Sequence, residues 1–322
     1  MSTDGTPMTV IGGYLGAGKT TLLNHLLRNN QGLRLAVVVN DFGDINIDAD
    51  LVASTDGETI ALANGCICCS LVDGLAMVLT DLRGRADTID HVVVEASGVS
   101  DPVKIGHYGD ALGYTLEGVI VVADAERVRE RAADKYVGDI VVRQLQGADL
   151  VVLNKTDLVD AVELVSVRRW LTDLVPGARI VHARDGDVPV PILLGAIHEH
   201  DAQDDGQGGG RPDSDHAHFD SWSFVCETPL ARADVETFLA ELPEDVLRAK
   251  GFLRIAEDPD RPYLLQVVGH RSTLTPVRAL DVEPRTTRLV VIGLPGSIDN
   301  ERYERLLRVA SPRCRADPEM EP

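Results

Sequence analysis

Two kinds of hydrophobic pattern alternate along the first two-thirds of the chain. Short Val-rich runs predict strands that are buried on both faces, and they occupy residues 8–11, 35–39, 91–94, 118–123, 150–153 and 179–181. Segments with apolar residues three and four positions apart predict the intervening helices, at residues 20–27, 71–82, 125–133, 139–145 and 162–174. This alternation predicts an α/β fold with a doubly wound, mostly parallel sheet in residues 1–197.

The pattern changes after residue 197. Residues 198–218 combine acidic residues, glycines and two His-x-His pairs without an apolar period, which predicts a flexible linker. A smaller α+β domain is predicted over residues 219–310, with strands at 221–227, 251–255, 263–268 and 287–293 and helices at 231–239 and 300–309. Residues 311–322 are predicted to be a disordered tail. The linker histidines could bind a transition metal weakly, but a solvated linker is the simpler interpretation.

Composition narrows the partners of this chain. Its 322 residues carry a formal net charge of −20, which disfavours binding to nucleic acid or to an anionic membrane surface. No apolar run is long enough to cross a membrane, and the first residues do not resemble a secretion signal, so we expect a cytoplasmic protein. Three of the five cysteines are clustered, which favours metal or redox chemistry over a disulfide framework.

Residues 13–20 read Gly-Tyr-Leu-Gly-Ala-Gly-Lys-Thr, a phosphate-binding loop pattern between a predicted strand and a predicted helix. Glycines allow the backbone to turn its N–H groups toward phosphate oxygens, and the start of the helix adds a positive dipole. Lys19 would reach the β- and γ-phosphates, and the Thr20 hydroxyl would bind Mg²⁺. The predicted phosphate-binding residues are Gly13, Gly16, Ala17, Gly18, Lys19, Thr20 and Thr21. The alternative is a chance glycine-rich turn.

A second nucleotide signal follows the strand at 150–153, where the chain reads Asn154-Lys155-Thr156-Asp157. The Asp157 carboxylate can accept hydrogen bonds from N1–H and the 2-amino group of guanine, a donor pair that adenine lacks. Asn154 could contact the purine edge, and Lys155 could pack over the phosphate loop or the ring. The nucleotide is therefore expected to be GTP, although Asn and Asp at such positions also cap helices.

The strand at 91–94 leads into Glu95-Ala96-Ser97-Gly98. A carboxylate at this strand end can hold Mg²⁺, and the N–H of Gly98 can approach the γ-phosphate. A segment ordered by that contact would relax after hydrolysis. Lys19, Thr20, Glu95 and Gly98 are the candidate catalytic residues. The alternative for this segment is a capping turn that runs into Ser100-Asp101-Pro102.

The chain also carries a candidate metal site in Cys66, Cys68 and Cys69. Thiolates suit Zn²⁺ and other thiophilic metals, and three ligands within four residues do not easily close a tetrahedral site. Asp41 and Asp44 follow the strand at 35–39 and are candidate ligands to Mg²⁺ or to this thiolate site. The alternatives are buried packing for the cysteines and a solvated acidic turn for the aspartates.

Taken together, GGYLGAGKTTLLN, NDFGDINID, NGCICC, VVVEASGVSDP and NKTD resemble the CobW-like metallochaperone GTPases, relatives of the UreG and HypB nickel-insertion GTPases. The resemblance covers nearly the whole chain outside the linker and the tail. It implies that the cysteines form an internal site for zinc or cobalt, and that GTP hydrolysis is coupled to delivery of the metal to a client metalloprotein or a cofactor pathway. Asp41 and Asp44 depart from it, because they stand where the family generally has glutamate.

The resulting hypothesis is a GTPase that hydrolyses GTP to GDP and phosphate, with Mg²⁺ at the phosphates and Zn²⁺ or Co²⁺ at the thiolates. No arginine finger or water-orienting residue is evident, so we expect slow intrinsic turnover. A homodimer is left open. One alternative is a non-enzymatic GTP-dependent switch with a structural zinc. A small-molecule kinase on the same fold is disfavoured by the Asn-Lys-x-Asp motif and by the lack of an evident acceptor site.

Overall fold

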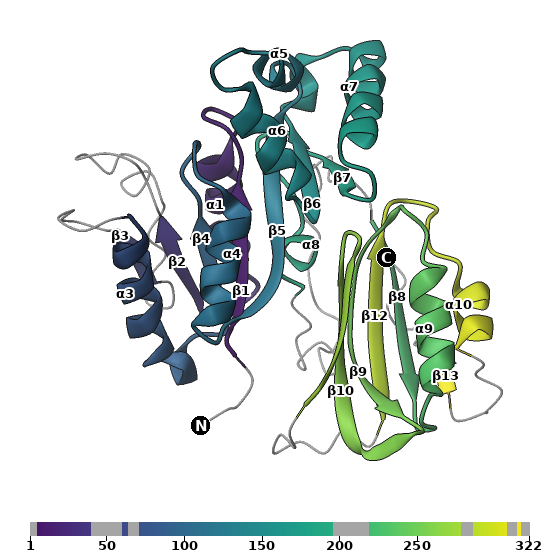
Figure 1. The fold of residues 1–322 in the computed structure, drawn as a ribbon. Coiled ribbons are helices and arrows are strands. Elements are labelled where there is room, and N and C mark those ends of the chain that lie inside the picture. The colour runs from purple at the N-terminus through teal and green to yellow at the C-terminus, as the bar shows by residue number, and fades with distance from the viewer. Residues whose placement is uncertain are drawn as a thin grey trace, which may run out of the picture. The chain divides into compact units, whose positions relative to one another are not determined.

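The computed structural model describes residues 5–39, 60–63, 71–195, 219–277, 286–307 and 314–316. The chain divides into two compact units (Figure 1). The first comprises residues 1–194 with 268–272, and the second comprises residues 195–267 with 273–322. Cys66, Cys68, Cys69, Asp41, Asp44 and the predicted linker at 198–218 lie outside the described residues.

A seven-stranded sheet forms the centre of the first unit. Its strands are β1 (Pro7–Gly12), β2 (Leu35–Val39), β3 (Ile60–Ala63), β4 (His91–Glu95), β5 (Thr115–Asp124), β6 (Leu150–Asn154) and β7 (Arg179–His182). They lie in the order β3-β2-β4-β1-β5-β6-β7, and every neighbouring pair is parallel. The predicted parallel sheet is therefore confirmed. The loops after β1, β4, β5 and β6 consequently meet at one edge of the sheet, where such folds bind ligands.

Helices between the strands cover this sheet (Figure 1). They are α1 (Lys19–Arg28), α3 (Leu71–Arg83), α4 (Pro102–Ala111), α5 (Val128–Ala132), α6 (Gly138–Gln146), α7 (Ala161–Leu174) and α8 (Val190–Leu194), with 3₁₀ turns at Ala86–Thr88 and Thr156–Leu158. Apolar side chains of α3 and α4 pack on β1, β2 and β4, and those of α6 and α7 pack on β5 and β6. No helix within the described ranges is long and apolar enough to span a bilayer.

Helix α4 is absent from the sequence prediction because two glycines, Gly106 and Gly109, interrupt its apolar pattern and lower its intrinsic helix propensity. Its start signals are nonetheless present. The Asp101 side chain accepts a hydrogen bond from the Val103 N–H at 3.1 Å, and Pro102 occupies the first turn. The capping turn considered above thus exists at Asp101, directly after the Glu95–Gly98 segment.

The second unit is an α+β domain, as predicted. Its sheet order is β11-β10-β9-β12-β8-β13, from β8 (Asp220–Cys226), β9 (Val246–Ile255), β10 (Asp258–Val268), β11 (Arg271–Pro276), β12 (Thr287–Gly293) and β13 (Cys314–Ala316). Helices α9 (Arg232–Ala240) and α10 (Asn300–Leu306) lie on one side of it (Figure 1). Aromatic rings fill the core, with the Trp222 ring centroid 5.3 Å from those of Phe224 and Tyr303.

Three strands were not anticipated from the pattern. β3 is short, β11 is mostly polar and exposed, and β13 falls inside the segment predicted to be a disordered tail. β13 pairs antiparallel with β8, with Cys314 opposite Cys226. Backbone pairing along a sheet edge needs no apolar alternation of its own, so this strand left no sequence signal.

Candidate functional site

The phosphate-loop sequence connects β1 to α1 and turns through three glycines with positive φ angles, Gly13, Gly16 and Gly18. Gly18 precedes α1 with φ 104°, and its carbonyl accepts the Leu22 N–H at 2.9 Å. A Cβ atom at Gly18 would lie 2.3 Å from the Asn154 Nδ2 atom. Glycine is therefore required at this position both by conformation and by the close approach of the loop after β6.

Two oxygen donors meet at the start of α1. The Thr20 hydroxyl donates to Glu95 Oε1 at 3.1 Å, and the Glu95 carboxylate is buried at the end of β4. Lys19, also buried, begins the same helix. Hydroxyl and carboxylate oxygens are ligands that Mg²⁺ accepts, so this pair fits the predicted magnesium position.

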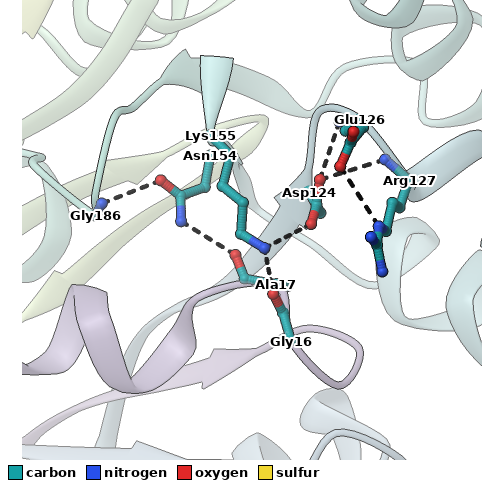
Figure 2. A network of polar contacts seen from close by, with 8 residues as sticks. All are labelled: Gly16, Ala17, Asp124, Glu126, Arg127, Asn154, Lys155 and Gly186. Carbon is teal, nitrogen blue, oxygen red and sulfur yellow. Dashed lines mark hydrogen bonds and ion pairs between the residues drawn. The ribbon is translucent and has the colours of Figure 1, made fainter. Parts of the chain in front are cut away.

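Asn154, the last residue of β6, joins two loops (Figure 2). Its Nδ2 donates to the Ala17 carbonyl at 3.1 Å, and its Oδ1 accepts the Gly186 N–H at 3.0 Å. The side chain is buried. In this arrangement Asn154 positions the phosphate loop and the loop after β7, and its predicted contact with a purine edge stays a prediction.

Lys155 links the phosphate loop to the end of β5 (Figure 2). Its Nζ donates to the Gly16 carbonyl at 2.8 Å and pairs with Asp124 Oδ2 at 2.7 Å. Asp124, which ends β5, also accepts the Glu126 N–H at 2.9 Å through Oδ1. Lys155 thus contacts the phosphate loop through its Nζ, and its predicted role at a nucleotide stays a prediction. Asp124 is not among the residues predicted from the sequence, because its only signal is its place at the end of a buried strand.

The loop after β7, residues 183–187, is a further element that the sequence analysis missed. The Ala183 carbonyl accepts both the Thr156 N–H at 3.2 Å and the Thr156 hydroxyl at 3.0 Å. Asp187 pairs with His25 of α1 at 3.1 Å. The loop is therefore fixed beside Asp157, which is exposed and available to a ligand.

His182 ends β7 just before this loop. Burial lowers the pKa of His182, and the nearby Arg168 lowers it further. The imidazole is thus kept neutral near pH 7, which avoids placing a second cation beside Arg168.

The segment after β4 is held from α6. Gly98 is buried, and the carbonyls of Gly98 and Ser100 both accept hydrogen bonds from Gln144 Nε2, at 3.1 and 2.7 Å. Thr20, Glu95, Gly98, Asn154 and Lys155 are thus gathered at one edge of the sheet. Within the described part of the chain, no group of three or more His, Cys, Asp or Glu residues could hold a metal ion.

Comparison with known proteins agrees with this arrangement. The model of the CobW/HypB/UreG nucleotide-binding domain matches residues 7–182, and that of the cobalamin synthesis protein cobW C-terminal domain matches residues 219–311. "Zinc chaperone CobW" from Sinorhizobium sp. is 35% identical, over 89% of this chain and 92% of the relative. Its namesake from Pseudomonas aeruginosa is 36% identical, over 89% and 87%. "Zinc chaperone YjiA" from Escherichia coli is 33% identical, over 58% and 60%. The chain belongs to the CobW/HypB/UreG family of nucleotide-binding proteins.

Proposed function

We propose that this protein binds and hydrolyses GTP and uses its nucleotide state to bind a transition metal and deliver it to a client metalloprotein. Zinc is the leading cargo, because relatives aligned over most of the chain are named zinc chaperones. Cobalt remains the second choice from thiolate chemistry.

The observation that carries the nucleotide half of the proposal is the assembly of the phosphate loop, Glu95 and the loop after β6 at one sheet edge. Lys19 would bind the β- and γ-phosphates, and Asp157 would select guanine. Thr20 and Glu95 would hold Mg²⁺, which when bound neutralises charge on the phosphates. Gly98 would donate its N–H to the γ-phosphate. In-line attack by water would then release phosphate, with Lys19 stabilising the charge that develops.

The metal half rests on Cys66, Cys68 and Cys69, which lie between β3 and α3 in the chain. Since β3 is parallel to β2, β3 ends at the same edge of the sheet as β1 and β4, and the cysteines follow β3 in the sequence. Ordering of these loops by a γ-phosphate could therefore change metal affinity. By linkage, the metal would change GTP affinity by the same factor.

The test is a competitive measurement of Zn²⁺ and Co²⁺ affinity with GDP and with a non-hydrolysable GTP analogue. A difference of about fivefold or more between the two states is expected, which is the lower end of typical coupling. The Cys66→Ala, Cys68→Ala, Cys69→Ala variant should lose tight binding in both states. Equal affinities would contradict the coupling. A chelator-resistant zinc in every state would instead favour the structural-zinc switch.

Turnover gives a second test. GTP hydrolysis by the protein alone should be slow and should respond to Zn²⁺ or Co²⁺. A fast rate that ignores both metals would count against the proposal, and phosphate transferred to a small acceptor instead of water would revive the kinase alternative.

A further inference from the structure

A buried glutamine on α6 holds the segment after β4 at two points. Gln144 is 2% exposed, and its Nε2 donates to the carbonyl oxygens of Gly98 and Ser100 at 3.1 and 2.7 Å. The reversed amide orientation would place Oε1 against two carbonyl oxygens, with no hydrogen between them. Both donor hydrogens of Gln144 are therefore committed to residues 98–100.

The same segment lies directly against the phosphate loop. A Cβ atom at Gly98 would fall 2.5 Å from Leu15 Cδ2 and 2.9 Å from the Leu15 backbone nitrogen. The approach of Gly98 to the phosphate loop is thus as close as the backbone permits. Whatever fixes residues 98–100 also fixes how near the Gly98 N–H lies to a phosphate bound in that loop.

The carbonyl oxygen of the Gln144 amide does not add to these hydrogen bonds. Its Oε1 is buried and accepts no hydrogen bond from the described residues. A buried acceptor without a partner costs free energy, which an apolar side chain of similar length would avoid. Fold stability alone is consequently a weak reason for glutamine here, whereas its pair of donors suits the two carbonyls.

We propose that Gln144 is a positioning residue that sets the preference for GTP over GDP, by holding residues 98–100 where the Gly98 N–H meets the γ-phosphate. This inference rests on the proposed function, since it takes GTP as the ligand and Gly98 as a γ-phosphate contact. GDP lacks that phosphate, so its binding does not depend on where residues 98–100 lie. Loss of the Gln144 contacts therefore lowers affinity for GTP selectively.

Space beside Gln144 makes the residue suitable for substitution. It lines a cavity of about 320 Å³ together with Tyr14, Leu15 and Val141. Side chains of similar length, such as methionine and glutamate, can be placed there without overpacking the core. Gln146 ends the same helix and is exposed, so its substitutions provide matched controls.

The experiment measures the affinity of a non-hydrolysable GTP analogue and of GDP for the full chain and for Gln144→Met, Gln144→Glu, Gln146→Met and Gln146→Glu. We expect Gln144→Met to lose about 5- to 20-fold in affinity for the GTP analogue and less than about twofold for GDP, from two lost hydrogen bonds. Gln144→Glu should lose more, because a carboxylate would face two carbonyl oxygens. The Gln146 variants should match the parent protein.

Amide hydrogen exchange without nucleotide provides a readout that does not depend on GTP. Exchange at residues 98–101 should quicken in Gln144→Met and stay unchanged in Gln146→Met. Equal losses for GTP and GDP, or quicker exchange with an unchanged preference, would overturn the positioning role. If the parent protein binds no GTP, the proposed function fails and this inference fails with it, whereas a failure confined to the Gln144 variants leaves the proposed function standing.

Discussion

The loops after β6 and after β4 lie at the same edge of the same sheet, yet they are anchored differently. Asn154 and Lys155 tie the loop after β6 to the backbone of Ala17 and Gly16. Residues 98–100 after β4 are held instead by one glutamine from a neighbouring helix. The first arrangement builds contacts into the phosphate loop itself, which suits a base site that is the same for GTP and GDP. The second is held from outside the phosphate loop, by a side chain of α6, which suits a segment that distinguishes GTP from GDP.

Replacement of Asp157 by Asn should reduce nucleotide affinity more than any other substitution in the loop after β6. Loss of two charge-assisted hydrogen bonds to guanine should weaken GTP and GDP alike by about 100-fold or more. Xanthine nucleotides should then bind better than guanine nucleotides, because the Asn amide can donate to the 2-oxo group. Titration with GTP and XTP checks this, with Asp173→Asn on α7 as the control. Unchanged GTP binding would remove Asp157 from the site.

Asn154→Ala tests, through the stability of the protein, how firmly Asn154 holds the phosphate loop and the loop after β7. It leaves the buried Ala17 carbonyl and Gly186 N–H without their present partner, which should cost about 2–4 kcal/mol in the free energy of unfolding. Urea denaturation measures this, and Asn29→Ala, at an exposed hydrogen bond to His25, should cost less than about 1 kcal/mol. A loss as small as that of the control would mean that the two loops are held by other contacts.

Lys155→Met removes the link between Gly16 and Asp124 while keeping the length of the side chain. Affinity for GTP and GDP should fall together by about 3- to 10-fold, because a partly exposed ion pair and hydrogen bond contribute modestly. Lys135→Met, which removes a cation beside the Tyr136 ring, is the control. A loss of affinity for GTP but not for GDP would contradict the proposal that the loop after β6 binds both nucleotides equally.

The smallest effect concerns pH. The pKa of His182 is lower in the folded protein than its ordinary value of 6.5. Below about pH 6.5, the unfolded chain therefore binds a proton at His182 more readily than the folded protein does. Stability should therefore decline as the pH falls through this range, and it is fully restored above it. His182→Gln should reduce that decline in urea titrations at pH 7.5 and 5.5, with His107→Gln on α4 as the control. An identical decline in the parent protein and in His182→Gln would assign the acid sensitivity elsewhere.

The motifs on the chain predicted the parallel sheet and placed Gly18, Thr20, Glu95 and Lys155 at its loop edge, because local patterns specify a strand, a glycine-rich turn and a helix start. Asp124, Gln144 and Gly186 escaped prediction for a physical reason. Asp124 pairs with Lys155, Gln144 donates to the Gly98 and Ser100 carbonyls, and the Gly186 N–H donates to Asn154. All of these partners are distant in the chain, so the contacts leave no local sequence pattern. Helix α4 was not predicted because Gly106 and Gly109 interrupt its helical pattern of apolar residues.

The aromatic core of the second unit has a practical consequence. The chain contains two tryptophans, Trp170 on α7 of the first unit and the buried Trp222 on β8 of the second. Each unit therefore carries its own intrinsic fluorophore. A Trp170→Phe variant would leave tryptophan emission from the second unit alone, and Trp222→Phe would leave tryptophan emission from the first unit alone. Melting of the two halves could then be followed separately without any attached dye, and a ligand-dependent shift could be traced to the half that binds it.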